Sequence, residues 1–348
     1  MDLTKYKNKG RIGLENLGNT CFLNACMQVL NNTHELNHIL DINEASVAEP
    51  KQIPETTILN EWNELRKIMW SGNGIVAPRK FVYNVQQIAK QNRRDLFTGH
   101  AQNDMPEFLL FFMDCIHMSI SRHVKMNING TAKNELDNIA IKCYEMLKQT
   151  YLSEYSEIMN MFYGIYVSVI ESKETSIMHS VKPESFFILD LPVADNLVSF
   201  NTLYDCMNHY TKAELLEGDN AWFNETTGKK EDVKKQIRFW SFPQIVVITL
   251  NRFTPDGTSK LNNHIMFPLD DLDLSPYACG YKASSYKYEL YGICNHMGGV
   301  TGGHYTAFVR NVDNEWLHYN DRTVEIVDNP NAVISQAAYC LFYRKKNN

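Results

Sequence analysis

The hydrophobic pattern of this chain changes near residue 160, and that change limits the folds that the chain can adopt. Over residues 12–160, apolar side chains recur mostly at helical spacing. From about residue 161 the period shifts towards two, in runs rich in Val, Ile, Tyr and Phe that Gly, Asn, Asp and Pro clusters separate. A helical front and an antiparallel-looking β back predict an α+β fold.

Three stretches of the first part are expected to form helices. After Thr20, the apolar residues of Phe22–Leu30 follow the spacing of one helix face. A second helix is expected to open at Asp104, because Asp104 and Glu107 have the spacing of a capping box. A third helical stretch covers about residues 135–160.

The second part is expected to consist of strands joined by turns. The expected strands are Tyr163–Ile170, Ser185–Leu191, Gln244–Phe253, Tyr286–Asn295, Tyr305–Asn311, Glu315–Asn320 and Ala338–Arg344. The segments with the strongest loop character are 41–57, 217–235 and 254–263.

Composition excludes several classes of protein. The chain has 34 Lys+Arg against 40 Asp+Glu and a formal charge of −6, which argues against nucleic-acid binding by a broad basic face. A hydrophobic content of 44% excludes global disorder. The N-terminus has no apolar signal segment, and the longest uncharged apolar stretch, Ile158–Ile170, is too short to span a bilayer. We therefore expect a soluble cytoplasmic or nuclear protein, without a membrane partner, whose 8 cysteines are free thiols.

The segment Gly13–Gln28 contains the most informative cysteine. Cys21 lies at the predicted start of a helix, where unsatisfied N–H groups and the helix dipole favour a thiolate, the form that acts as a nucleophile. Asn16 lies five residues earlier, across the Gly18–Thr20 turn, and its amide could donate to an oxyanion beside the Cys21 N–H. A lone cysteine at a helix start is more commonly a small buried apolar residue, and Cys26 keeps that interpretation.

His304 has the strongest context among the 11 histidines for a base that would serve Cys21. Two glycines, Gly302 and Gly303, precede it and leave room for a substrate backbone. His304 then leads into an expected strand that would hold the imidazole rigidly. The next strand ends at Asn320 and Asp321, and a carboxamide or carboxylate on a neighbouring strand can orient an imidazole. The alternative is an ordinary histidine at a strand edge.

Together these segments resemble the ubiquitin-specific protease family of deubiquitinases. The resemblance covers about residues 12–345 in collinear boxes, and boxes that fall in order are stronger evidence than any one of them. The boxes are Gly13–Gln28 (the Cys box), Gln102–Leu109 (similar to the Gln-Gln-Asp box), Ile248–Phe253, Met266–Tyr277, Tyr288–Val324 (the His box) and Ala338–Arg344.

The resemblance implies a papain-like right hand. A helical thumb would cover about residues 12–160, and β fingers and a β palm would cover about residues 161–345. Residues 12–345 would then form a single catalytic domain after an N-terminal tail of residues 1–11. The implied activity is that of a deubiquitinating cysteine protease, which hydrolyses the isopeptide or peptide bond after the C-terminal glycine of ubiquitin and needs no cofactor. The implied partners are ubiquitin and ubiquitinated proteins, and we expect a monomer.

The family's catalytic roles can be carried over position by position. Cys21 is then the nucleophile and His304 the general base. Asn320 falls where the family has the third triad member, and Asn16 falls where it has the oxyanion donor. Asp321 matches an adjacent carboxylate that assists the histidine in some members.

The family's substrate contacts can be carried over in the same way. Asp104 and Glu107 lie in the Gln-Gln-Asp box, and their carboxylates would pair with the basic tail of ubiquitin. Capping of the helix is the competing role for both residues, and the two roles can coexist. His296, a second histidine of the His box that is not the base, is expected to line the pocket. Gly303 and Tyr305, on either side of the base, complete the expected contacts.

One departure from the family concerns metal binding. Many members bind zinc at the fingertips through two C-x-x-C pairs. The matching positions here are Glu171 and Glu174 in the first pair, and lie near Asn224 and Thr227 in the second. No thiolate ligand remains at these positions, so no metal is expected. The fingers would then hold by strand pairing and packing alone.

Two other functions stay open beside the active hydrolase. One is a catalytically inactive ubiquitin-binding scaffold, and the other is a protease for another ubiquitin-like modifier. The presence of Cys21, His304, Asn320 and Asn16 favours the enzyme over the scaffold. The sequence does not separate ubiquitin from other modifiers, because the channel for their tails would look similar.

Overall fold

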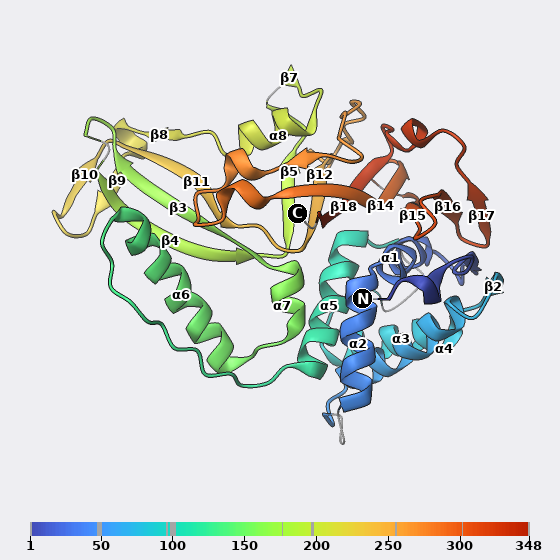
Figure 1. Cartoon of the computed structure of the whole chain (residues 1–348). Coiled ribbons are helices and arrows are strands. Elements are labelled where there is room, and N and C mark those ends of the chain that lie inside the picture. The colour runs from blue at the N-terminus through green and yellow to red at the C-terminus, as the bar shows by residue number, and fades with distance from the viewer. Residues whose placement is uncertain are drawn as a thin grey trace.

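The structure is a computed structural model that describes residues 2–46, 51–94, 97, 102–175, 177–195, 198–254, 256–300 and 302–346. Helices dominate the first half of the chain and strands the second, which confirms the α+β prediction (Figure 1). The helices are α1 (Cys21–Asn31), α2 (His34–Ser46), α3 (Glu55–Met69), α4 (Arg79–Gln91), α5 (Met105–Ile120), α6 (Glu135–Ser153), α7 (Glu157–Phe162) and α8 (Leu203–Tyr210). Within the described ranges, no helix combines the length and the apolar character needed to cross a membrane.

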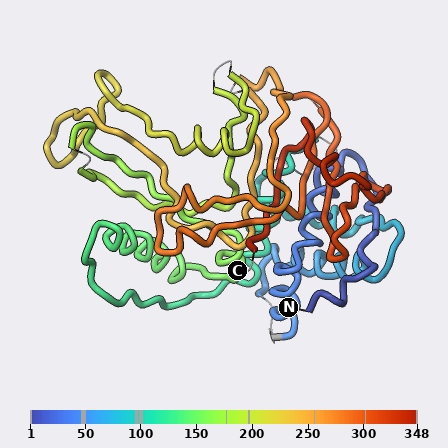
Figure 2. The backbone as a smooth tube through the Cα atoms, turned by 45° about the horizontal axis from the view of Figure 1, so that its top comes forward, coloured from blue at the N-terminus to red at the C-terminus, as the bar shows by residue number. Residues whose placement is uncertain are grey.

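Two larger sheets make up most of the β part (Figures 1 and 2). The palm sheet has the strand order β17-β16-β15-β14-β18-β12-β5, and β13 pairs with β14. Its strands are β5 (Ile188–Pro192), β12 (Ile245–Asn251), β13 (Leu272–Asp273), β14 (Lys287–Gly298), β15 (Gly303–Arg310), β16 (Trp316–Asn320), β17 (Thr323–Ile326) and β18 (Ala338–Lys345). The finger sheet has the order β4-β3-β11-β8 and extends away from the N-terminal helices, with α6 along one side of it (Figure 1). Its strands are β3 (Gly164–Ser172), β4 (Met178–Phe186), β8 (Glu214–Leu216) and β11 (Val233–Ser241).

Three short strand pairs complete the described β structure. They are β1 (Ile12–Leu14) with β2 (Gly74–Val76), β6 (Ala194–Asp195) with β7 (Val198–Ser199), and β9 (Trp222–Asn224) with β10 (Lys229–Glu231). The β1–β2 pair is parallel and joins the segment before α1 to the segment after α3.

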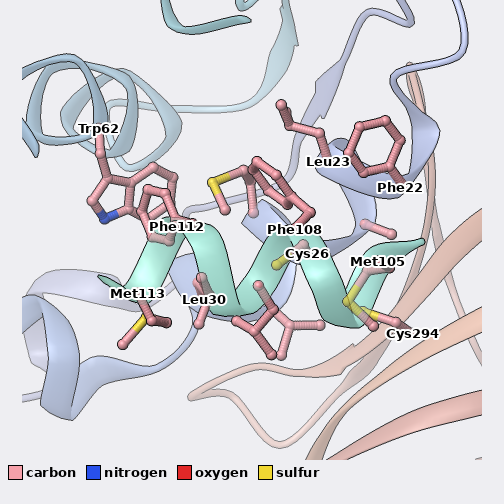
Figure 3. Close-up of a cluster of buried hydrophobic side chains, with 14 of the residues drawn as sticks. Phe22, Leu23, Cys26, Leu30, Trp62, Met105, Phe108, Phe112, Met113 and Cys294 are labelled. Carbon is pink, nitrogen blue, oxygen red and sulfur yellow. The ribbon is translucent and has the colours of Figure 1, made fainter. Parts of the chain in front are cut away.

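Helix α1 lies between α5 and the palm sheet, and its burial determines where the site is built. Every residue of α1 is buried, which agrees with the helix expected after Thr20. Phe108 and Phe112 of α5 pack in the same core cluster as Cys26 and Cys294, so this cluster joins helix to sheet (Figure 3). A side chain at Gly292 of β14 would lie 2.4 Å from Val29. The close approach of α1 to the palm sheet therefore requires glycine at that position.

Two expected elements prove to be divided. The helix expected over 135–160 is two helices, α6 and α7, because Tyr155 between them forms an antiparallel bridge with Arg122. The strand expected over Ser185–Leu191 divides at Phe187 into β4 of the finger sheet and β5 of the palm sheet. Phe187 is buried, so the apolar pattern runs on across the point where the chain changes sheets.

The loop expectations are correct in one case of three. Segment 254–263 has no helix or named strand in its described part. Segment 217–235 contains β9, β10 and the start of β11, whose charged residues Lys234 and Lys235 conceal a strand that pairs along β3. At 41–57, α2 continues to Ser46 and α3 begins at Glu55, while residues 47–50 lie outside the described residues.

A partly buried ion pair joins the first helices to the last strand. Arg344 of β18 donates to the carboxylate of Glu35 in α2, and its Nη2 also donates to the Asn32 carbonyl at 3.1 Å. The Arg344 guanidinium stacks over the Tyr291 ring, 4.3 Å from its centroid. The helical and β parts therefore share polar contacts as well as a core.

The first residues of the chain pack against these helices, although the sequence suggests a tail. Tyr6 is buried, and its ring stacks on His34 and meets Trp70 at a tilt, with 4.5 Å between centroids in each case. Burial, with the charges of Arg344 and Lys5, lowers the pKa of His34 to about 3. His34 is therefore neutral in the folded protein at neutral pH.

This neutral histidine predicts a measurable pH dependence of stability. Between pH 6.5, the ordinary histidine pKa, and about pH 3, the folded value, His34 is protonated in the unfolded chain and neutral in the folded chain. The free energy of unfolding therefore falls as pH falls through this range. His34→Phe keeps a ring in the stack without this proton. Between pH 7 and pH 4 the free energy of unfolding should fall in both proteins. In urea unfolding, we expect this fall to be smaller in the variant than in the wild type by on the order of 3 kcal/mol. His38→Gln, exposed on the same helix, should behave like the wild type. Equal losses in the wild type and His34→Phe would contradict the prediction.

Candidate active site

Cys21 is the first residue of α1, as the sequence predicts. The turn before it uses backbone conformations that few residues adopt, with φ of 102° at Gly18 and 53° at Asn19. The Thr20 hydroxyl accepts a hydrogen bond from the Leu17 N–H at 2.9 Å and makes no side-chain capping bond to the helix. Thr20 therefore closes the turn that presents Cys21, and the thiol lies at the helix mouth.

The thiol of Cys21 is buried, with 4% of the residue exposed. Burial raises the pKa of Cys21, and the charge of Asp321 acts in the same direction. Hydrogen bonds from the backbone N–H of Tyr305 and of Phe22 oppose the increase without cancelling it. The expectation that the helix start favours a thiolate at Cys21 is therefore not met, because loss of solvent outweighs the local N–H groups.

His304 and Asn320 form the pair that the sequence expects. His304 is at the start of β15 and Asn320 ends β16, and His304 Nε2 lies 2.7 Å from Asn320 Oδ1. An amide oxygen can only accept, so Nε2 carries the hydrogen and Nδ1 is left as the basic nitrogen. Tyr305, whose N–H reaches the Cys21 thiol, directly follows His304. Among the described residues no hydrogen bond joins Cys21 to His304.

Asp321 contacts two asparagines. Its Oδ2 accepts from Asn16 Nδ2 at 3.0 Å, and its Oδ1 accepts from Asn24 Nδ2 at 2.8 Å. The side-chain oxygen Oδ1 of Asn16 in turn accepts hydrogen bonds from the backbone N–H groups of Gly18 and Thr20, both at 3.1 Å. The carboxylate that the resemblance assigns to histidine assistance thus holds the expected oxyanion donor, with one Asn16 amide hydrogen left for another acceptor.

Asp104 is held by tyrosines, and it does not cap α5. Tyr305 and Tyr339 each donate a hydroxyl hydrogen bond to Asp104 Oδ1 at 3.0 Å, and no side-chain capping bond is made at the helix start. Burial raises the pKa of Asp104, and the two hydroxyls offset this only in part. The capping box expected for Asp104 and Glu107 is therefore wrong, because the carboxylate faces the palm strands.

A cavity of about 270 Å³ lies beside His304. Its lining residues are Gln102, Asn103, Asp104, Phe253, His296, Gly299, Val300, Gly302 and Tyr305. Three expected substrate contacts, Asp104, His296 and Tyr305, are thus brought together, and Gly303 lies next to the lining. Glu107 is exposed on α5 and does not line the cavity. Larger hollows of about 420 and 450 Å³ are lined by other residues, so volume alone does not locate the site.

His296 is fixed in one orientation by Lys260. Lys260 Nζ lies 3.0 Å from His296 Nδ1 and donates to the His296 carbonyl at 2.6 Å. Burial and the charge of Lys260 lower the pKa of His296 to about 4. His296 is consequently a neutral wall of the cavity, and its ring contacts that of Tyr305 at a tilt, with 4.7 Å between centroids.

Several contacts at the site were missed from the sequence. Gln102 pairs its amide with both backbone groups of Gly303, accepting from its N–H and donating to its carbonyl at 2.9 Å. A side chain at Gly303 would lie 2.3 Å from His296 Nε2, so glycine is required there. Asn24, three residues after Cys21 on α1, was detectable from helical spacing, whereas Lys260 lies in a loop with no local signal.

The expected zinc positions at the fingertips carry polar contacts between side chains. Arg238 donates to Glu171 at 2.6 Å, while Asn224 and Thr227 donate to Glu231 at 3.1 and 2.6 Å. In the part of the chain that the structure describes, no group of three His, Cys, Asp or Glu side chains has metal-binding geometry. The fingers hold by these hydrogen bonds as well as by strand pairing, which corrects the expectation of pairing and packing alone.

Comparison with known proteins identifies the family. The family model described as ubiquitin carboxyl-terminal hydrolase matches residues 12–343. Ubiquitin carboxyl-terminal hydrolase 2 of Homo sapiens is 33% identical over 350 residues, which cover 96% of this chain and 55% of that protein. The Gallus gallus protein of the same name is 32% identical over 342 residues, covering 96% and 93%.

Solved structures show the same fold. A chain of the SAGA Ubp8/Sgf11/Sus1/Sgf73 DUB module bound to ubiquitin aldehyde superposes with a TM-score of 0.74 at 23% identity, covering 100% of this chain and 72% of that chain. This chain spans about half the length of the human relative. From the family model and these relatives, the chain belongs to the ubiquitin carboxyl-terminal hydrolase family.

Proposed function

We propose that this chain is a thiol-dependent ubiquitin hydrolase that cleaves the isopeptide or peptide bond after the C-terminal glycine of ubiquitin. The observation that carries the proposal is the His304–Asn320 pair, which leaves a basic Nδ1 on the histidine at the start of β15, the strand that packs against α1. Family membership supports the same chemistry. One structural neighbour is bound to ubiquitin aldehyde, which supports ubiquitin as the partner.

In the proposed first step, His304 Nδ1 removes the proton from Cys21 and the thiolate attacks the carbonyl carbon of the terminal glycine. Because burial raises the pKa of the thiol, this transfer depends on His304 moving into contact with it when substrate binds. Asn320 keeps Nε2 protonated and so directs the basic nitrogen towards the thiol. A neutral amide is sufficient for this role, because a thiolate–imidazolium pair is already charge-balanced.

The proposed oxyanion donors are the Asn16 amide and the backbone N–H of Cys21. Asp321 keeps the Asn16 amide nitrogen at the helix mouth, and the turn N–H groups hold its oxygen. The donor is thus oriented before charge develops, which is what makes such groups effective.

The remaining steps use the same groups. Imidazolium His304 gives its proton to the departing lysine amine, and the C–N bond breaks to leave a thioester on Cys21. Water then loses a proton to His304 and attacks the thioester, which releases the ubiquitin carboxylate and the thiol.

We further propose that the cavity beside His304 receives the tail of ubiquitin. Among the described residues the partners of the Asp104 carboxylate are tyrosine hydroxyls and not cations, and a basic tail residue would stabilise its charged form. Glu107, exposed nearby on α5, would add to the attraction. His296, Gly303 and Tyr305 would form the walls.

The finer features of the protein are also proposals. We propose that residues 12–345 act as one catalytic unit, with a thumb up to about residue 160 and fingers and palm beyond it. The core cluster that joins α1 and α5 to β14, β15 and β18 supports this view. We propose a monomer that uses no metal and acts in the cytoplasm or the nucleus.

A ubiquitin probe with a C-terminal electrophile tests the function. The protein should form a covalent adduct with this probe and none with matched probes built on other ubiquitin-like modifiers. Labelling only by another modifier would identify that modifier as the substrate. Binding of ubiquitin without any adduct would favour the inactive scaffold and overturn the proposal.

A further inference from the structure

Residues 2–11 form a segment, here called the strap, that precedes the region matched by the family model. One end of the strap is fixed to the helices. Tyr6, 4% exposed, stacks on His34 and contacts the Trp70 ring at a tilt, and Lys5 forms an ion pair with Asp41 of α2 at 2.7 Å.

The other end of the strap is fixed to the palm sheet. The Asn8 N–H donates to Asp313 at 2.9 Å, and the Arg11 guanidinium pairs with Glu315, both in or beside the turn between β15 and β16. Gly10, with φ of 81°, offers its carbonyl to the hydroxyl of Tyr319 at 2.8 Å. The strap therefore spans from α2 and α3 to β16, and the figures show the first and last parts of the chain side by side (Figures 1 and 2).

This contact matters because the ladder between β15 and β16 stops before it reaches His304 and Asn320. The register between β15 and β16 ends at Ala307 opposite Tyr319. His304 lies three residues before Ala307, and Asn320 lies one residue beyond Tyr319, so both are past the end of the shared ladder. No main-chain pairing between β15 and β16 fixes the distance between their side chains.

Asn320 pairs with Thr323 of β17, and its two neighbours in the chain are each anchored by a further hydrogen bond. On one side, the buried Tyr319 donates its hydroxyl to Gly10 of the strap. On the other side, the Asp321 carbonyl accepts from the Leu14 N–H at 2.8 Å. The strap supplies the first of these anchors.

We propose that the strap sets the position of Asn320 at His304, and that Tyr319 is a positioning residue acting through it. This inference rests on the proposed function for its catalytic consequence. Without the strap, the end of β16 would keep its pairing with β17 and its contact at Asp321 but would lose the anchor at Tyr319, and the hydrogen bond that orients His304 would be made part of the time.

A pair of full-chain variants at Tyr6 tests the inference. Tyr6→Ala removes the ring that fixes the strap between His34 and Trp70, whereas Tyr6→Phe keeps the ring and is the matched control. With ubiquitin carrying a C-terminal fluorophore, at a temperature where both variants are folded, we expect Tyr6→Ala to lower kcat about three- to tenfold and to change KM less than about twofold. Tyr6→Phe should retain the wild-type kcat. Amide hydrogen exchange over residues 317–320 should be faster in Tyr6→Ala than in Tyr6→Phe.

Tyr319→Phe tests the far end of the strap by removing one hydroxyl, and it keeps the inference testable if Tyr6→Ala does not fold. It should lower kcat by a similar factor, and adding it to Tyr6→Ala should cause little further loss, because both changes release the same anchor. A Tyr6→Ala protein that melts earlier but keeps its kcat and its exchange over 317–320 would overturn the inference. A wild type that does not act on ubiquitin would overturn the proposed function instead, and the exchange comparison would still decide whether the strap holds β16.

Discussion

Cys21→Ala is expected to lower the turnover of ubiquitin substrates by at least about 10⁴-fold, because no other nucleophile replaces the thiolate. The change removes a single sulfur atom and introduces no larger or polar group at this buried residue, which is 4% exposed, so the fold should be retained. Binding of ubiquitin should persist, because the proposed tail contacts lie in the cavity beside His304. Release of a C-terminal fluorophore measures turnover, and fluorescence anisotropy with labelled ubiquitin measures binding.

Cys279→Ser is the matched control for this experiment. Cys279 is the one described cysteine that is partly exposed; the other seven are buried. If the enzyme were sensitive to the loss of any accessible thiol, Cys279→Ser would lower turnover. If Cys21 is the nucleophile, Cys279→Ser should keep the wild-type turnover. Turnover that survives in Cys21→Ala would refute the assignment of the nucleophile.

Asn16→Ala and Asp321→Ala are each expected to lower kcat about 10²- to 10³-fold, the usual scale for loss of one oxyanion donor. The reason is the 3.0 Å hydrogen bond through which Asp321 holds the Asn16 amide. If Asp321 acts through Asn16, the double variant should be no more than about threefold slower than Asn16→Ala alone. Steady-state kinetics on the four proteins of this cycle measures the coupling.

Multiplied effects in the double variant would contradict this role and would favour a direct action of Asp321 on His304. A second readout separates charge from position. The charge of Asp321 raises the pKa of Cys21, so Asp321→Ala should lower that pKa and make alkylation by iodoacetamide faster at neutral pH while turnover falls. Alkylation and turnover that fall together would mean that the helix mouth has been disrupted.

The places of Cys21, His304 and Asn320 in the helix and strands were predictable because their signals are local. Cys21 follows a glycine-containing turn at the start of a helix with a clear apolar spacing, and α1 begins at that residue. His304 follows two glycines and leads into a strand, and Asn320 ends the next strand. Each of these features depends on residues within a few positions in the chain.

The roles of the carboxylates were not predictable, since they depend on distant parts of the chain. Asp104 has the spacing of a helix cap, but Tyr305 and Tyr339 are available to it only after the palm sheet folds against α5. Asp321 follows the orienting Asn320, but α1 brings Asn16 and Asn24 to it. A short polar side chain accepts whichever donors the fold supplies, so its spacing in the sequence does not determine its partner.

The class of the fold and the places of α1, β15 and β16 follow from the sequence alone, because periodicity acts over a single helix or strand, while the roles of Cys21 as nucleophile and His304 as base stay predictions. Only the tertiary structure decided that burial raises the pKa of Cys21, that β4 and β5 belong to different sheets, and that residues 2–11 reach β16. Solvent exclusion and contacts between residues about 300 positions apart, such as Gly10 and Tyr319, exist only once the helices close on the palm sheet. The residues proposed for catalysis therefore lie in short segments with local signals. The contact between Gly10 and Tyr319 forms only when the two ends of the chain meet.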